Sequence, residues 1–405
     1  MATEFRPEEP VSRTNIALNR SRWLRTAATI TAAVLSACVA KDRPRTSTVI
    51  SSDALTVIGE DSLATAYIDV ADLGGSVAYL SSTEPFVTII DKTGRVTRQF
   101  GAPGEGPGDF RNPTSLDAQA DTLYVWDVRQ GAASMYDTAG RYLGRRRGEA
   151  SFGGVQKHAR TNLLGRPGMY RRFGSLAVTA AYPNGVALPG EQRSYSLLAL
   201  DDAGSILDTV WASSLPASAN EQAPNKQMQI VPIPVWAKCS TRRLVIYDPE
   251  LGMTSLRTPQ GVEVRRFQTE SEAVAISKDD MVQFVSFGFG RLYQEANLPR
   301  PNSFDEEMAK WVQEGEAKGI NPSSYVGYTS VLCDHRGHVW LDRFSFEDSP
   351  LGYSRTWVVL SGDSGRRSVT FPEGFRLMLL SEARGYGVLM DSTSMESPAW
   401  VDLGE

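Results

Sequence analysis

Residues 121–140 read DTLYVWDVRQGAASMYDTAG, and this stretch decides the fold. It opens with a polar corner at Asp121 and continues with apolar residues at alternate positions, Leu123 and Val125, as a half-buried β-strand does. A second corner follows at Asp137–Gly140, where the Asp side chain can bond the backbone and the Gly permits a positive φ angle. The stretch therefore predicts two hairpins in succession.

The same unit of a turn followed by an alternating strand recurs along the chain. Its six copies are Gly74–Leu80, Asp121–Asp127, Asn184–Leu188, Arg242–Asp248, Gly337–Asp342 and Gly385–Asp391. The second turn recurs at Asp91–Gly94, Asp201–Gly204, Thr258–Gly261 and Gly362–Gly365. Two hairpins per repeat predict four strands per repeat and an all-β protein.

The last repeat is short, because the chain ends soon after Val401 and leaves no room for a second hairpin. Residues Leu55–Ile58 form a strand-like run ahead of the first repeat and have no earlier partner. A ring of four-stranded sheets closes when the first strand completes the last blade. The sequence thus predicts one six-bladed β-propeller over residues 54–405.

A helical insertion is expected at residues 277–321, between blades four and five. Ser277 with Asp280, and Ser303 with Glu306, have the spacing of helix-capping pairs. The apolar residues expected on the faces of these helices are Phe284, Phe287, Phe289 and Leu292 in the first and Phe304, Met308, Trp311 and Val312 in the second. Long insertions on a rigid scaffold often bind ligands or partners.

The stretch FGAPGEGPGDFRNP at residues 100–113, followed by Leu123–Asp127 and the turn Asp137–Gly140, resembles an NHL-type repeat of bacterial six-bladed propellers. The resemblance covers blade two closely and blades one, five and six more loosely, whereas blades three and four depart from it. It implies a binding or scaffolding module more often than a defined reaction.

The N-terminus has the layout of a bacterial export signal. Three arginines precede an uncharged apolar run at residues 26–37. The run ends in Leu35–Cys38, which resembles a lipoprotein box and implies a signal peptide at residues 1–37 and lipid on Cys38; an ordinary cleaved signal is the alternative. Residues 38–53 then form a lipidated tether. In such lipoproteins Val39, in place of Asp, implies transport to the outer membrane.

The composition argues against nucleic-acid binding. The chain has 42 Lys plus Arg against 47 Asp plus Glu, for a net charge of -5, whereas binding to phosphates requires a basic surface. Removal of residues 1–37 takes away five basic and three acidic side chains, which leaves -7. No apolar run reaches the roughly 18 residues of a membrane-spanning helix, so we expect contact with the membrane through the lipid anchor only.

Four carboxylates end the second strands of their blades: Asp127, Asp248, Asp342 and Asp391. Carboxylates that converge on one face could bind Ca²⁺. Repetition in blade after blade instead favours a structural role, in which each side chain caps backbone N–H groups of the next loop.

His335 and His338, with Asp334, suggest a metal site, but the same residues match the first hairpin turn of blade five. A zinc site needs at least three protein ligands, and the chain has only three His and three Cys. The turn is therefore the favoured interpretation, and we predict neither a metal nor another cofactor.

Cys239 and Cys333 precede the first hairpins of blades four and five. Export would allow a disulfide, but equivalent positions on neighbouring blades diverge from the axis unless both lie near the centre. A Cα separation of about 5.5 Å is then hard to reach, so we expect two buried thiols.

Two functions fit these observations. The first is a non-enzymatic, envelope-anchored binding or scaffold protein that holds a protein, a glycan or a small ligand; its candidate binding residues are Arg129, Arg343, Glu347 and Trp311. The alternative is a metal-dependent extracytoplasmic hydrolase or lyase of the lactonase-like kind. Its candidate metal ligands are Asp127, Asp248, Asp342 and Glu347. No Ser, His and Asp set suggests catalysis, so the first function is preferred.

Overall fold

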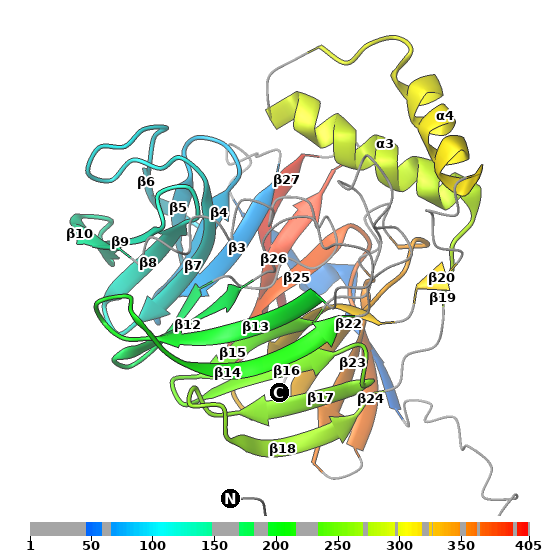
Figure 1. The fold of residues 1–405 in the computed structure, drawn as a ribbon. Coiled ribbons are helices and arrows are strands. Elements are labelled where there is room, and N and C mark those ends of the chain that lie inside the picture. Colours follow the sequence, from blue (N-terminus) through cyan, green and yellow to red (C-terminus); the bar gives the residue numbers. More distant parts are fainter. Residues whose placement is uncertain are drawn as a thin grey trace, which may run out of the picture. The chain divides into compact units, whose positions relative to one another are not determined.

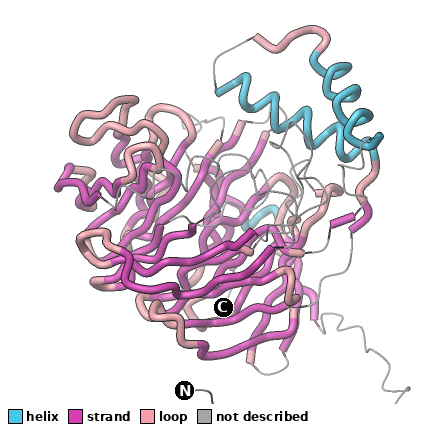
Figure 2. The backbone as a smooth tube through the Cα atoms, viewed as in Figure 1, coloured by secondary structure: helices cyan, strands magenta, loops and turns pink. Residues whose placement is uncertain are grey.

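A computed structural model of the chain describes residues 46–58, 66–147, 170–181, 193–215, 234–269, 274–295, 299–317, 324–325, 327–348, 354–362, 365–391 and 395–403. These residues form six blades, each built on four antiparallel strands and one of them extended by a fifth strand, arranged as a propeller (Figure 1). Strands dominate the molecule, and the two long helices lie together at one side (Figure 2). The structure confirms the all-β, six-bladed propeller.

Successive segments of the chain build the first five blades. Blade one contains β3 (Tyr67–Asp72), β4 (Ser76–Ser81), β5 (Val87–Asp91) and β6 (Val96–Phe100). Blade two contains β7 (Pro113–Gln119), β8 (Thr122–Asp127), β9 (Ala132–Asp137) and β10 (Tyr142–Arg147). Blade three contains β11 (Tyr170–Phe173), β12 (Leu176–Ala181), β13 (Arg193–Leu200) and β14 (Ile206–Leu215). Blade four contains β15 (Val235–Ser240), β16 (Arg243–Asp248), β17 (Met253–Arg257) and β18 (Glu263–Gln268). Blade five contains β21 (Tyr328–Cys333), β22 (Val339–Arg343), β23 (Thr356–Ser361) and β24 (Gly365–Thr370).

Blade six joins the two ends of the propeller. It contains β25 (Phe375–Leu380), β26 (Arg384–Met390) and β27 (Glu396–Asp402), and its fourth strand is β2 (Leu55–Val57) from the start of the fold. β2 pairs antiparallel with β27, with Leu55 opposite Val401. The predicted closure of the ring is thus confirmed.

The predicted tether is too long at its C-terminal end. β1 (Thr46–Val49) pairs in parallel with β24 as a fifth strand of blade five, and Ser52–Ala54 forms a 3₁₀ turn. The Ser/Thr-rich composition suggested a linker, but β-branched residues also suit the free edge of a sheet. Cys38, with residues 1–45 as a whole, lies outside the described residues.

Blade three differs from the predicted repeat. Its first hairpin joins β11 to β12 through Gly174, whose φ angle is +66°. The predicted copy at Asn184–Leu188 lies outside the described residues. The prediction relied on the Asn184–Gly185 pair, because Asn-Gly is a strong hairpin signal. It therefore missed the turn at Gly174.

Turns between the third and fourth strands lie at one end of the blades, which we call the turn face. In blade two, the Asp137 carboxylate accepts hydrogen bonds from the Ala139 and Arg141 N–H groups. In blade four, Gly261 has a φ angle of +85°, and a Cβ atom there would lie 2.7 Å from the Val210 carbonyl oxygen of β14. Local hydrogen bonding thus stabilises the turn in blade two, and close packing on the neighbouring blade fixes the turn in blade four.

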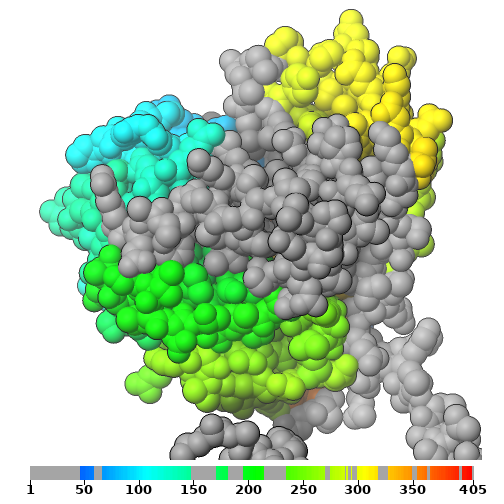
Figure 3. Space-filling view, viewed as in Figure 1, coloured from blue at the N-terminus to red at the C-terminus, as the bar shows by residue number. Residues whose placement is uncertain are grey.

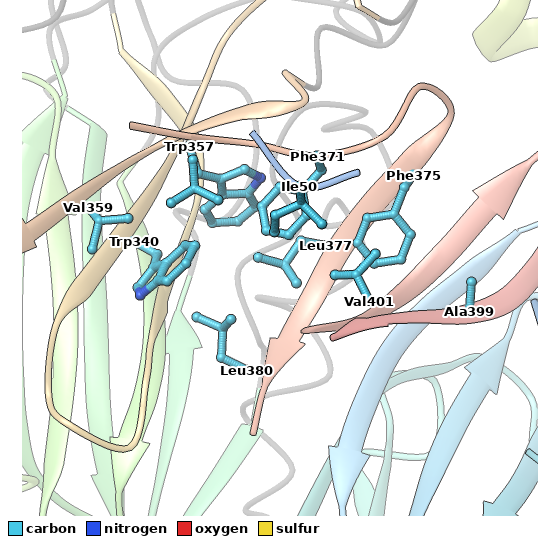
Figure 4. Packing of buried hydrophobic residues seen from close by; sticks show 11 residues of the cluster. Ile50, Trp340, Trp357, Val359, Phe371, Phe375, Leu377, Leu380, Ala399 and Val401 are labelled. Atoms are coloured by element: carbon cyan, nitrogen blue, oxygen red, sulfur yellow. The ribbon is translucent and has the colours of Figure 1, made fainter. Parts of the chain in front are cut away.

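Apolar side chains fill the spaces between blades. Between blades five and six, Trp357, Phe371 and Phe375 pack with Val401 of the closing hairpin. Ile50, which follows β1, inserts into the same cluster (Figure 4). The segment that was predicted as tether is therefore part of the core.

The insertion contains α3 (Lys278–Glu295) and α4 (Phe304–Ala317), flanked by β19 (Val274–Ala275) and β20 (Ser324–Tyr325). It follows β18 and precedes β21, as predicted, at the end of the blades opposite the turn face; we call this end the helix face. No helix in the part of the chain that the structure describes is long and apolar enough to cross a membrane.

Both helices start near the predicted residues. Ser277 and Asp280 form a reciprocal capping box, in which each side chain accepts the other's backbone N–H at 2.8 and 3.0 Å. At α4, the Ser303 hydroxyl donates to the Glu307 carboxylate at 2.6 Å, one residue beyond the predicted partner Glu306.

The expectation of two free thiols is wrong, because Cys239 and Cys333 form a disulfide with their Cα atoms 4.9 Å apart. Cys239 lies on β15 and Cys333 on β21, the innermost strands of neighbouring blades. The innermost strands of neighbouring blades lie close together around the axis. The two Cα atoms are therefore near enough for a disulfide, although equivalent positions farther from the axis would not be. The disulfide thus joins blade four to blade five near the centre of the propeller.

Candidate functional site

Charged side chains on the inner strands line the centre of the propeller. Arg171 of β11 makes a bidentate ion pair with Asp69 of β3, with N–O distances of 2.8 and 3.0 Å. The same two side chains bond both polar backbone groups of Leu116 on β7: Asp69 accepts its N–H and Arg171 donates to its carbonyl. One ion pair therefore connects blades one, two and three.

A second ion pair continues this arrangement. Lys238 of β15 lies 2.9 Å from both carboxylate oxygens of Asp117 on β7, and it also donates to the Ala118 carbonyl. Asp117 accepts the backbone N–H of Arg172 on β11 as well. Blades two, three and four are connected in this way.

The third pair joins blade six to blade one. Arg376 of β25 contacts the Glu396 carboxylate at 3.0 Å, and together they bond the carbonyl and the N–H of Tyr67 on β3. We call the three pairs, Asp69–Arg171, Asp117–Lys238 and Glu396–Arg376, the charged belt. Among the described residues, the belt and the Cys239–Cys333 disulfide connect the inner strands at every junction except the one between blades five and six.

Asp342 is a buried acid beside the belt. Its carboxylate accepts hydrogen bonds from the Thr329 hydroxyl at 2.8 Å and the Ser354 N–H at 3.1 Å. Burial raises the pKa of Asp342 to about 8, although these two hydrogen bonds and the Arg376 charge oppose the rise. At neutral pH the side chain is mostly protonated and can donate a hydrogen bond.

A small polar cavity of about 90 Å³ lies against Asp342. It is lined by inner strands of blades one, three, four, five and six, and both Arg171 and Arg376 of the belt contribute to its wall. A cavity of this size has room for a few water molecules or a small polar group. The cavity wall therefore presents the neutral acid Asp342 and two cations, Arg171 and Arg376, that already have carboxylate partners.

The other strand-end carboxylates cap backbone groups, as predicted. Asp127 accepts four backbone N–H groups, from Arg111, Asn112, Arg129 and Gln130, at 2.6 to 3.0 Å. Asp248 accepts the Glu250 and Leu251 N–H groups, and Asp391 accepts that of Met395. Within the described ranges, His, Cys, Asp and Glu side chains form no group of three or more that could hold a metal ion.

The histidine pair lies in a turn, as predicted. The Asp334 carboxylate accepts the backbone N–H groups of Arg336 and His338, and it contacts the His338 ring at 2.8 Å and the Trp340 indole at 3.2 Å. Burial would raise the pKa of Asp334, but the hydrogen bonds from His338 and Trp340 hold it below its usual value. His338 therefore supports the turn.

The helical insertion is fixed to the propeller by an apolar cluster. Met281, Phe284 and Val285 of α3 and Val312 of α4 pack on Phe344, which lies just after β22. Trp311 and Phe346 are half-buried at the edge of the cluster. We call α3, α4 and this cluster the helical platform.

Three of the four predicted binding residues belong to the platform or are next to its residues in sequence. Trp311 belongs to the cluster, while Arg343 and Glu347 flank the two phenylalanines that anchor it. Arg129 is exposed in the turn after β8, on blade two. Neither the charged belt nor the neutral state of Asp342 was predicted from the sequence, because the residues involved are far apart in the chain and only the fold brings them together.

Comparisons with known proteins found no matching family model and no matching curated sequence, so the resemblance to NHL repeats stays a prediction. Several solved structures are similar in fold. A member of the DUF4221 family from Bacteroides vulgatus has a TM-score of 0.48 and 8% identity over 86% of this chain and 95% of its own. A calcium-binding protein, regucalcin, from Agrobacterium tumefaciens has a TM-score of 0.44 and 9% identity, over 88% of this chain and 95% of its own. Virginiamycin B lyase from Staphylococcus aureus has a TM-score of 0.42 and 9% identity, over 86% and 99%. At such identities, the activities in these names belong to those proteins alone.

Proposed function

We propose that this protein is an exported, lipid-anchored binding protein without catalytic activity, which holds a protein, a glycan or a small ligand on its helix face. The observation that carries the proposal is the helical platform. Both helices are packed on the propeller at Phe344, which follows the cavity-lining Asp342 by two residues. A fixed surface of this kind loses little conformational entropy when a ligand binds.

The state of the candidate metal ligands supports binding over metal-dependent catalysis. Of the candidate metal ligands, Asp127 and Asp248 are used to cap backbone groups, and Asp342 is mostly neutral. A Ca²⁺ site would need several ionised or carbonyl oxygens directed at one point. The alternative of a metal-dependent hydrolase or lyase would require these side chains to leave their present partners.

The disulfide supports export, because structural disulfides persist in oxidising compartments outside the cytoplasm. Within the proposal, the signal peptide is removed, Cys38 carries the lipid and Val39 directs the protein to the outer membrane. Mass spectrometry of the N-terminal peptide from the mature protein would reveal the lipid.

The binding proposal can be tested with protein isolated from its native envelope after cross-linking. Bound proteins, glycans and small molecules would be measured by mass spectrometry for the wild type and for Arg343→Ala and Arg129→Ala. The control is Arg141→Ala, which removes a cation that is 80% exposed on the turn face. We expect recovery of the ligand to fall for one or both helix-face variants and to stay constant for the control. Equal recovery from all four proteins would contradict the proposed surface.

A further inference from the structure

The position of β1 determines where the N-terminal segment leaves the propeller. β1 runs parallel to β24, and Thr46 lies opposite Arg367 while Val49 lies opposite Thr370. β24 starts at the hairpin after Ser361, on the turn face, and runs toward the helix face. Thr46 is therefore the end of β1 nearer the turn face, and the chain that precedes it starts from that side. In Figure 1, α3 and α4 lie at the end of the blades away from the hairpin that joins β23 to β24.

The reach of this segment is short. Thr46 follows Cys38 by eight positions, with seven residues between them, and a fully extended chain over these eight steps spans at most about 28 Å. A lipid on Cys38 would therefore hold the turn face close to a bilayer. This step rests on the anchor that is part of the proposed function.

The turn face carries an unusual set of exposed apolar side chains. They occupy the starts of the outer strands of three successive blades, directly after the hairpin turns. These residues, which we call the apolar rim, are Leu143 of β10, Ile206 and Leu207 of β14, and Val262 and Val264 at the start of β18, and they are 45–62% exposed. Single exposed apolar residues are ordinary, whereas recurrence at one structural position in consecutive blades indicates a common surface.

The rim residues of blades three and four lie on adjoining outer strands. The turn before Val262 packs against β14, because Gly261 lies against the Val210 carbonyl. The surfaces of blades three and four adjoin in the space-filling view, in green and yellow-green (Figure 3). The exposed apolar residues of β14 and β18 therefore belong to neighbouring parts of the turn face.

The charges around the rim suit an anionic lipid surface, even though the whole chain is acidic. Three nearby acids, Asp137, Asp202 and Glu263, are each paired with at least one arginine. A fourth, Asp208, is exposed next to Leu207 and accepts the Thr209 N–H. Arg242 and Arg243, in the first hairpin of blade four, are exposed on the same face. Paired acids and exposed arginines reduce the repulsion that an acidic protein would meet at anionic headgroups.

We propose that the apolar rim rests on the lipid surface and that the anchor on Cys38 holds it there. The helical platform then faces away from the bilayer. This orientation presents the proposed binding face to soluble or cell-wall ligands, while apolar side chains that would otherwise be exposed to water contact the lipid. A short anchor and a weak adhesive surface are together more effective than either alone, because the first raises the local concentration for the second.

The test is depth-dependent quenching with the lipidated, mature protein in vesicles of phosphatidylethanolamine and phosphatidylglycerol that contain nitroxide-labelled lipid. A fluorophore is attached to Leu207→Cys at the rim or, as the matched control, to Glu314→Cys on α4. Quenching several-fold stronger at the rim is the expected result. Equal quenching at the two positions, or stronger quenching on α4, overturns the orientation.

A second variant tests the rim itself. Leu207→Glu with Val262→Glu alters only exposed side chains, so the unfolding midpoint should stay unchanged. A fluorophore at Leu143→Cys should lose most of its quenching in this background, and undiminished quenching would rule out contact through the rim. Flotation of the vesicles and the mass of the N-terminal peptide are recorded in parallel. Absence of lipid on Cys38 would overturn both the anchor and this orientation. The mass of the N-terminal peptide distinguishes that result from a lipidated protein whose helix face lies against the bilayer.

Discussion

Replacement of Asp342 by Asn is expected to stabilise the protein at neutral and alkaline pH. The pKa of Asp342 is about 8 in the folded protein, against 3.8 for an ordinary Asp. Between these values the folded state binds one more proton than the unfolded state, so its stability falls as the pH rises. The loss approaches about 1.4 kcal/mol per pH unit. Below about pH 4 the contribution is fully present, and above about pH 8 it is lost.

The asparagine introduced by this substitution would retain the geometry of the site without the titration. Its amide oxygen can accept the Ser354 N–H, and its NH₂ group can donate to the Thr329 hydroxyl, which is able to accept. Relative to the wild type, Asp342→Asn should therefore gain about 3 kcal/mol of unfolding free energy between about pH 5 and about pH 7.

Urea unfolding, followed by tryptophan fluorescence at several pH values, measures this difference. Gln283→Asn, an exposed change between two groups that do not titrate, is the control and should follow the wild type at each pH. A constant difference between Asp342→Asn and the wild type over this range would refute the assignment of a neutral, buried acid.

Three further predictions concern the connections between blades. Replacing both Cys239 and Cys333 by Ala should lower the unfolding free energy by about 2–4 kcal/mol, because the disulfide joins residues 94 apart; equal urea midpoints for variant and wild type would contradict it. Asp69→Ala should lower the unfolding free energy by about 3–5 kcal/mol, because it leaves the largely buried Arg171 cation without its carboxylate partner. Adding Arg171→Met to Asp69→Ala should restore part of the lost unfolding free energy. No restoration would show that the unpaired Arg171 is not the cause of the destabilisation. Gly261→Ala should lower the thermal midpoint more than Gly74→Ala, because both glycines have positive φ angles but only Gly261 lies against a neighbouring backbone; equal shifts in calorimetry would exclude the packing argument.

The sequence was sufficient for those parts of the fold that local chemistry determines. The turn Asp137–Gly140 contains its own hydrogen-bond acceptor and its positive-φ residue, so the hairpin can be read without knowledge of its neighbours. The helix start at Ser277 is equally local. Ring closure was also predictable, because Leu55–Val57 is a strand without an early partner.

Features that depend on convergence at the axis could not be predicted in the same way. Asp69 and Arg171 are more than a hundred residues apart, and nothing in either segment marks its partner. The disulfide was mispredicted for the same reason, because the separation of two inner strands depends on the whole ring. β1 was missed because a short Ser/Thr-rich strand has the composition of a linker, and its partner strand lies more than 300 residues later.

The central claim is that the carboxylates of the propeller serve structure, while the helix face serves binding. The most direct measurement is the metal content of protein purified without chelators, combined with thermal unfolding in the presence of Ca²⁺ and of EDTA. We predict no stoichiometric metal and the same unfolding midpoint in both solutions. One metal ion per chain, with a stabilisation by Ca²⁺ that EDTA removes, would contradict the account and favour the metal-dependent hydrolase or lyase.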